Sequence, residues 1–338
     1  MKKHKRMKQA QHSELFRQVL NVDWPLVICR AGSHPHEAQY TDEYGRTALH
    51  LACMPADLPT NVINCLINAC PQATLKQNKW GCIPLHCACL YSDSKVVQRL
   101  LEVSPNAIHV KNEDGYTPLL HMMKWFEFNF QRGLAMLNRN YRSRPSSNRH
   151  SVLHKDPELD RLWRNACLLV TASYYGTVQD VGKAPSLHAF AGVADCPGVL
   201  FDFALTLQKE DLYRQDWKGD LPLHIASAIS SLVKVATTEK GDNERSVVEK
   251  LVDADPLAAK VFNHAGDLPL HLAIRDRKSA FDSDVLKICH AYPGAFAVFD
   301  SMSRLFPFML TAVGEYASLN ATYMFLRACP ELERLTVR

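Results

Sequence analysis

One short motif recurs along the chain, and its spacing limits the folds that the chain can adopt. An Asp or Asn is followed three residues later by Gly. A His stands five residues after that Gly and is the last residue of Leu-His or Pro-Leu-His. Full copies lie at 42–52, 78–88, 216–226 and 263–273. Partial copies lie at 112–120 and at 300–310, where Ser303 takes the Gly position and Pro307-Phe308 takes the place of Leu-His. Self-similarity at a fixed period indicates a repeat architecture.

A proline fixes the same register independently. In five copies a Pro stands ten residues before the Gly position, as Pro71 does before Gly81, and an amphipathic stretch precedes each Pro. Both markers give a period of about 34 to 37 residues where no insertion intervenes. The Asx–Gly pair favours a tight turn, and Pro in the first helical turn begins a helix. A second helix follows until the next Pro ends it. Such a hairpin cannot bury its apolar face alone, so stacked copies must supply the core.

These residues resemble the ankyrin repeat, whose pattern is Asp-x-x-Gly-x-Thr-Pro-Leu-His-x-Ala. The strongest matches are DEYGRTALHLA, NKWGCIPLHCA, DWKGDLPLHIA and NHAGDLPLHLA. The departure comes at the end of the second helix, where Cys, Ser, Asp or Tyr followed by Pro replaces the usual Gly-Ala-Asp. The resemblance implies an all-α solenoid of about seven ankyrin-type units with short turns or hairpins at the tips. It also implies a non-enzymatic module that binds another protein on its concave face.

The irregular stretches define the expected organisation of the chain. Pro185-Ser186-Leu187-His188 lies one period before the third full copy and marks a degenerate fourth unit. The unit before it carries two lengthened helices, at about 120–138 and 157–175. The expected parts are a basic disordered tail at 1–12, N-terminal capping helices at 13–41, and a repeat array at 42–338 with a long insertion at 122–182 and a shorter one at 233–244.

Charge and cysteine content restrict the class of partner and the compartment. The net charge is +4, and five cationic residues in the first twelve supply more than all of it, which disfavours nucleic-acid binding by the folded body. No apolar stretch approaches the roughly 20 residues that span a bilayer. Eleven cysteines without a secretory signal indicate reduced thiols and a cytoplasmic location. The tail segment 2–6 fits a loose nuclear-import pattern, so a nuclear location stays open. We expect a monomer.

The histidines and cysteines are the candidates for metal binding and catalysis. The motif histidines recur roughly 10 Å apart across stacked repeats, too far to share one metal ion. The resemblance to the ankyrin repeat implies that each of them bonds backbone groups of the turn. Cys82, His86, Cys87 and Cys89 form the densest cluster, but Cys87 and Cys89 occupy positions where another copy carries Leu272 and Ile274, which favours core residues over a metal site. No Gly-x-Ser-x-Gly motif or Walker phosphate loop occurs. The sequence therefore predicts no metal, no cofactor and no catalytic residue.

The turn tips hold the candidate binding residues, which flank the glycines at positions that ankyrin arrays use for binding. They are Tyr44, Arg46, Trp80, Tyr116, Trp217, Lys218, Asp220 and Asp267. Trp, Tyr and Arg dominate interface hot spots. The opposing interpretation is that Trp80 and Trp217 fold down over neighbouring tips. A different class of function also stays open, an enzyme or ligand-binding protein with its site in the 122–182 insertion.

Overall fold

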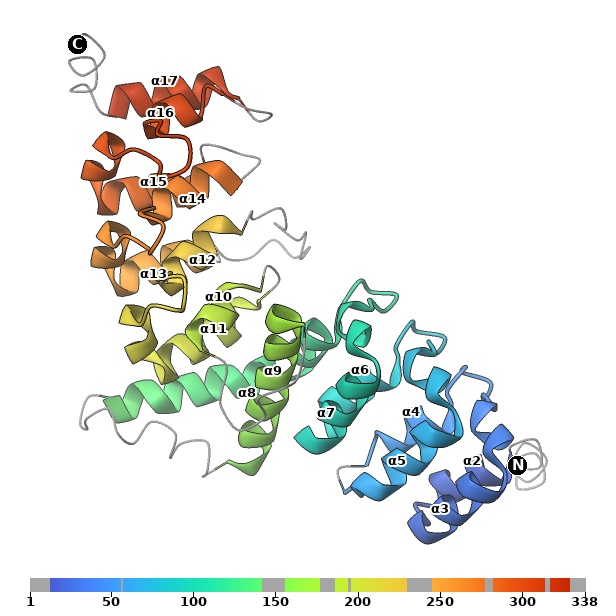
Figure 1. Ribbon diagram of the computed structural model, residues 1–338. Helices are drawn as coiled ribbons and strands as arrows, with labels where there is room; N and C mark the ends of the chain where they lie inside the picture. The colour runs from blue at the N-terminus through green and yellow to red at the C-terminus, as the bar shows by residue number, and fades with distance from the viewer. Residues whose placement is uncertain are drawn as a thin grey trace. The chain divides into compact units, whose positions relative to one another are not determined.

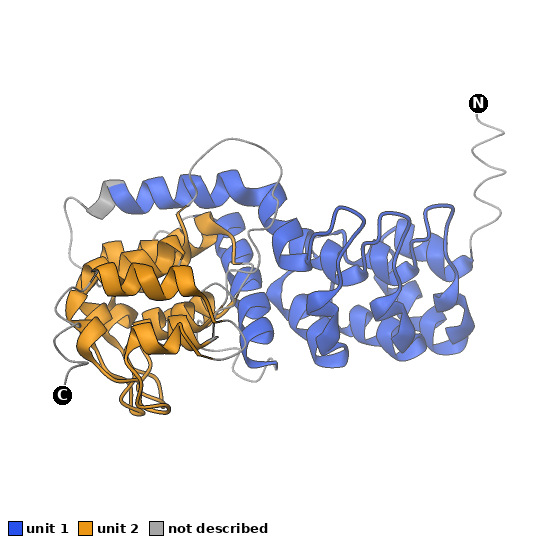
Figure 2. Cartoon of the chain, turned by 90° about the horizontal axis from the view of Figure 1, so that it is seen from above, with its two compact units in different colours: residues 1–185 blue, residues 186–338 orange. Residues whose placement is uncertain are grey.

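Paired helices joined by short turns build the whole of the described chain (Figure 1). The computed structural model describes residues 13–55, 57–141, 156–176, 186–193, 196–229, 245–276, 282–313 and 317–328. In these ranges the only β-pairing is an isolated bridge between Thr41 and Thr47. Contacts divide the chain into two compact units, residues 1–185 and 186–338 (Figure 2). No helix within the described ranges is both long and apolar enough to cross a membrane.

Unit 1 contains four helix pairs. They are α2 (Glu14–Leu20) with α3 (Trp24–Ser33), α4 (Ala48–Ala52) with α5 (Thr60–Ala69), α6 (Pro84–Tyr91) with α7 (Ser94–Val103), and α8 (Pro118–Tyr141) with α9 (Pro157–Tyr175). First helices pack on first helices, as α6 does on α8, and second helices pack on second helices, as α7 does on α9. Each pair therefore buries its apolar side chains against the pairs before and after it.

Unit 2 repeats this arrangement four times. Its pairs are α10 (Leu187–Ala191) with α11 (Gly198–Leu207), α12 (Pro222–Ala228) with α13 (Val247–Ala254), α14 (Pro269–Asp276) with α15 (Ser283–Ala291), and α16 (Pro307–Leu310) with α17 (Leu319–Ala328). Counted from α4, the described residues of the two units hold seven helix pairs. The predicted all-α repeat class is confirmed.

The motif leucine and the second helix supply the core of each unit. The Leu before each motif His is buried, at Leu49, Leu85, Leu187, Leu223 and Leu270. In α7 the buried side chains of Val97, Leu100 and Leu101 recur at helical spacing, which places them on one face. Helices α8 and α9 have 24 and 19 residues, whereas the other helices have ten or fewer. The two lengthened helices expected near 120–138 and 157–175 are therefore present.

The proline after each second helix begins a short 3-10 helix in addition to ending the α-helix. These five-residue helices are η1 (Pro35–Gln39), η2 (Pro71–Leu75), η3 (Pro105–His109), η7 (Pro256–Lys260) and η8 (Pro293–Ala297). The residue before the Pro leaves the helical region, as Cys70 does with φ −149° and ψ 85°. An α conformation there would clash with the proline ring. The degenerate repeat has a corresponding 3-10 helix that does not begin with Pro, η6 (Lys209–Tyr213).

The turn at 300–305 is one residue longer than the other turns. The N–H of Asp300 donates to the carbonyl of Leu305, whereas the N–H of Asp42 donates to the carbonyl of Arg46, four residues on. The positive φ falls on Arg304, at 59°, and not on the residue before it. Because Pro307 begins α16, Pro307-Phe308 corresponds to Pro-Leu of the motif. The sequence-based alignment with Leu-His was wrong by one residue.

Several predicted segments lie outside the described residues. They are the basic tail at 1–12, the insertion at 233–244, and the parts of the 122–182 insertion at 142–155 and 177–182.

Candidate functional site

The turns between repeats form two rows, one in each unit. Tip row 1 consists of residues 42–46, 78–82 and 112–116, and tip row 2 of residues 216–220, 263–267 and 300–305. Five of the six turns have a Gly with φ between 69° and 86°, a region that side-chain-bearing residues rarely adopt. The Asx side chain closes each turn: Oδ1 of Asp42 accepts from the N–H groups of Tyr44 and Arg46, at 2.9 and 2.8 Å. The backbone of each tip is thereby fixed by local bonds.

Neighbouring tips are joined by backbone hydrogen bonds. The N–H of Lys79 donates to the carbonyl of Tyr44 at 2.9 Å, and the N–H of Glu113 donates to that of Trp80 at 3.0 Å. In tip row 2, the N–H of His264 donates to the carbonyl of Lys218 at 2.9 Å. This close approach requires glycine, since a Cβ at Gly81 would lie 2.7 Å from the Glu113 nitrogen. Each tip row is therefore one hydrogen-bonded strip.

The motif histidines link consecutive repeats. In His50, His86, His224 and His271, Nδ1 accepts from the backbone N–H three residues earlier. Nε2 therefore carries the proton in the neutral ring, and it donates to a carbonyl of the next repeat. These acceptors are Cys82 for His50, Tyr116 for His86, Asp267 for His224 and Val298 for His271. His188 of the degenerate repeat makes the same bond to Asp220. Burial lowers the pKa of His50 and of His86 to about 4, so both rings stay neutral at pH 7.

Tip row 1 carries a stack of flat side chains. The rings of Tyr44 and Trp80 lie 5.6 Å apart and 15° from parallel, and the guanidinium of Arg46 lies 5.0 Å from the Tyr44 ring centre on its own tip. Arg46 also pairs with Asp42 at 2.7 Å. Trp80 thus folds over its neighbouring tip, as the structural interpretation expected, yet 50% of it stays exposed, as does 42% of Tyr44. Tyr116 is half-buried, and its carbonyl is held by His86.

Trp217 behaves differently from Trp80. It is 82% exposed, and the Lys218 ammonium lies 4.9 Å from its ring centre. Asp220, also predicted to bind a partner, is half-buried, and its Oδ1 accepts from Asn263 at 2.8 Å. Of the two interpretations, folding down describes Trp80, whereas Trp217 points outward.

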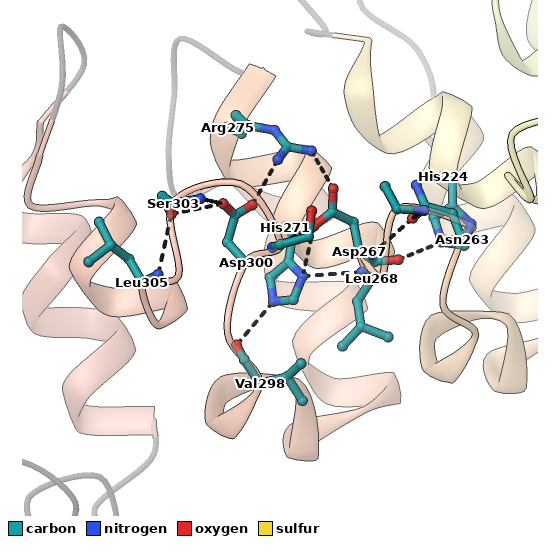
Figure 3. Close-up of polar contacts among 12 residues, drawn as sticks. His224, Asn263, Asp267, Leu268, His271, Arg275, Val298, Asp300, Ser303 and Leu305 are labelled. Carbon is teal, nitrogen blue, oxygen red and sulfur yellow. Dashed lines mark hydrogen bonds and ion pairs between the residues drawn. The ribbon is translucent and has the colours of Figure 1, made fainter.

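Asp267 is a correction to the predicted site. It is 2% exposed: Oδ2 accepts from Arg275 at 2.7 Å and Oδ1 from the N–H of Ser301 at 2.9 Å (Figure 3). Arg275 also donates to Asp300 at 2.9 Å, so one guanidinium joins two buried carboxylates. Burial acts to raise the pKa of Asp267, but the bonds from Arg275 and Ser301 bring it below its ordinary value. Asp267 joins repeats and cannot contact a partner.

The Cys and His cluster of α6 is part of the core. Cys87 and Cys89 are buried, and burial raises the pKa of the Cys87 thiol to about 12. Both ring nitrogens of His86 are occupied by backbone groups. Within the described ranges, no three His, Cys, Asp or Glu side chains are grouped as a metal site would need. The buried thiols and the bonded His86 ring are therefore core groups of the repeat.

The described part of the 122–182 insertion has polar residues with structural roles. Asn165, fully buried on α9, donates through Nδ2 to the carbonyls of Cys89 and Ser92 at 3.2 and 3.1 Å. Arg161 donates to the carbonyl of Leu90 at 2.8 Å. These side chains satisfy carbonyls at the end of α6 that have no partner inside the helix. They hold α9 against the preceding repeat.

Sequence reasoning missed two exposed aromatic residues on α8. Trp125 and Phe128 lie three residues apart on one face and are largely exposed, and Trp125 donates through Nε1 to His121 at 3.2 Å. The available signal was their place in an expected helix, opposite the face of the buried Met123 and Phe130.

The stacked helix pairs, the hydrogen-bonded tips and the histidine links define a helical repeat solenoid of the tip-and-hairpin kind. The family model described as Ankyrin repeat matches residues 80–112, which run from one tip of row 1 to the next. The same motif, turn geometry and histidine link recur in both units, so both units are built of repeats of the ankyrin kind. Ankyrin repeats generally mediate protein–protein interaction, and the family is typically non-enzymatic.

Among solved structures, the chain is similar to the ankyrin repeat domain of Bcl-3, titled a unique member of the IkappaB protein family, with 18% identity and a TM-score of 0.35. The match covers 83% of this chain and 99% of that chain. No curated protein matched the chain.

Proposed function

We propose that the protein is a monomeric, non-enzymatic scaffold or adaptor that binds a partner protein through its tip rows on the concave face. The observation that carries this proposal is the contrast between backbone and side chains at the tips. The backbone N–H groups are bonded within and between tips, whereas Tyr44, Trp80 and Trp217 stay exposed. Large aromatic side chains on a rigid backbone lose little conformational entropy on binding.

The contact residues proposed are Tyr44, Arg46, Trp80 and Tyr116 in tip row 1, and Trp217, Lys218 and Asp220 in tip row 2. Binding energy in protein interfaces concentrates in a few such anchors. The cations beside Tyr44 and Trp217 supply polar groups next to each apolar ring. We propose a cytoplasmic or nuclear site of action, a reducing environment in which free thiols such as those of Cys87 and Cys89 persist.

The test is an affinity capture of partners from cell extract, comparing the wild-type protein with the Trp80→Ala/Trp217→Ala double variant. The matched control is Tyr323→Ala, which removes an exposed aromatic residue of α17 away from the tips. A genuine partner should lose about 2 kcal/mol or more of binding free energy in the double variant and little in the control. Equal recovery by all three proteins would refute the tip-row proposal.

A further inference from the structure

The two tip rows present different charges. Tip row 1 has four exposed charged residues, of which three are acidic and one is basic: Glu43, Lys79, Glu113 and Asp114. In tip row 2, each of the four carboxylates accepts a hydrogen bond within the unit. Asp216 accepts from the N–H groups of Lys218 and Asp220, at 2.8 and 2.9 Å. Asp220 accepts from Asn263, and Arg275 binds the other two carboxylates. The acids of tip row 2 therefore serve its own structure.

Apart from Ser303 and His264, the exposed side chains of tip row 2 are cationic or apolar. Lys218 and Arg304 are exposed, as is the imidazole of His264 between them. Trp217 and Met302 are 82% and 77% exposed, so an apolar residue accompanies the cation on the first tip and on the last. The three tips are joined by the His264–Lys218 backbone bond and by the bond from Ser301 to Asp267. These side chains therefore lie along one continuous strip.

We propose that tip row 2 binds an acidic segment of the partner protein, with carboxylates at Lys218 and Arg304 and apolar side chains on Trp217 and Met302. The inference rests on the proposed function and adds the chemistry of the partner. Neighbouring repeats lie about 10 Å apart, so a segment reaching from the first tip to the third spans about 20 Å, or about six or seven extended residues. A basic segment would face Lys218 and Arg304 with like charge.

The test uses labelled peptides of about nine residues, which is longer than the predicted span. One alternates Glu with Leu, a second alternates Lys with Leu, and a third alternates Glu with Ser. Fluorescence anisotropy measures their binding to the full chain at low salt. We expect the Glu–Leu peptide to bind with a Kd of about 100 µM or tighter, and its affinity to fall as salt is added. The other two peptides should bind at least about tenfold more weakly.

Substitutions in tip row 2 test whether the peptide binds to this strip. Lys218→Glu/Arg304→Glu should lose about tenfold or more in affinity for the Glu–Leu peptide and gain affinity for the Lys–Leu peptide. Trp217→Ala should weaken binding of the Glu–Leu peptide, but this variant should not gain affinity for the Lys–Leu peptide. The matched control is Lys79→Glu, which reverses an exposed lysine of tip row 1 and should leave binding unchanged. Circular dichroism melts check that each variant is folded.

Three outcomes would overturn the proposal: no binding of the Glu–Leu peptide, no exchange of preference in a folded double-reversal variant, or an equal loss in Lys79→Glu. Self-association of the wild type that the double reversal abolishes would instead identify a second copy as the occupant, and would also overturn it. The proposed function fails separately if substitution of Trp80 and Trp217 by Ala does not weaken the binding of a captured partner. A partner lost with Trp80→Ala but retained by Lys218→Glu/Arg304→Glu would leave the proposed function intact.

Discussion

The Nε2 atom of His50 lies 3.0 Å from the carbonyl oxygen of Cys82, which belongs to the tip of the next repeat. The other ring nitrogen of His50 accepts from the N–H of Thr47 at the start of its own helix. One neutral imidazole thus closes a helix and joins two repeats. Protonation would remove the acceptor at Nδ1, so the bond from Thr47 depends on the ring staying neutral, whereas Nε2 would still donate to Cys82.

Acidification should weaken the fold between about pH 6.5 and pH 4. Burial lowers the pKa of His50 and His86 to about 4, whereas in the unfolded chain both titrate near 6.5. Between those values the unfolded chain binds protons that the folded chain does not. The stability contributed by the neutral rings is therefore complete above about pH 6.5 and is lost as the pH falls. Each ring accounts for about 3 kcal/mol.

Urea titrations at a series of pH values measure this effect. His50→Gln should flatten the pH dependence of the unfolding free energy, and His109→Gln, which changes an exposed histidine, should not. A wild-type stability that stays constant from pH 7 to pH 4.5 would contradict the assignment of neutral, buried rings.

Two glycine substitutions should separate backbone strain from steric conflict. Gly81 and Gly115 have φ of 69° and 81°, so alanine costs about 1 kcal/mol of conformational strain at either position. At Gly81 the new Cβ would also lie 2.7 Å from the Glu113 nitrogen, whereas at Gly115 nothing lies within 4 Å. Gly81→Ala should therefore reduce the unfolding free energy more than Gly115→Ala, as denaturant titration would measure. Equal losses would show that the tips do not approach this closely.

Removal of Arg275 should destabilise the protein by about 3 kcal/mol at pH 7, because Asp267 and Asp300 would remain buried as neighbouring anions. The loss from Arg275→Met should shrink as the pH falls towards 4, because without Arg275 the burial of Asp267 favours the protonated form of its carboxyl group. The control is Arg245→Met, which breaks an exposed pair with Asp253 and should cost less than about 1 kcal/mol. Chemical denaturation at both pH values distinguishes the two variants, and an equal cost at pH 7 would argue against the buried network.

The tryptophans should respond to truncation according to their surroundings. Trp163→Ala removes a buried ring of α9 and should cost about 3–5 kcal/mol of stability. Trp217→Ala should leave the unfolding free energy nearly unchanged, since its ring is exposed. Trp80→Ala should fall between them, with a loss of about 1 kcal/mol from its contact with Tyr44. Thermal melts of the three variants check this order, and a large loss in Trp217→Ala would place that ring in the core.

The amino-acid sequence by itself determined the features that depend on a few adjacent residues. An Asx followed by Gly forms a turn, Pro begins or ends a helix, and an apolar residue at helical spacing faces the core wherever it occurs. The repeat period, the all-α class and the lengthened helices of the third repeat therefore followed from the residues alone. The structural role of His86 followed from the resemblance to the ankyrin repeat that the motif carries.

Only the tertiary structure decided how side chains at equivalent tips are used, because that depends on the repeat packed against each tip. Trp80 meets Tyr44 and leans on it, whereas Trp217 stays outward. Asp267 occupies a tip position that the sequence marks as a surface, but Arg275 and the longer turn after it draw its carboxylate inward. The hydrogen bonds that Asp267 accepts from Arg275 and Ser301 join residues that are 8 and 34 positions apart in the sequence. A local motif does not encode a partner from the neighbouring repeat, so the stacking of the repeats made these assignments.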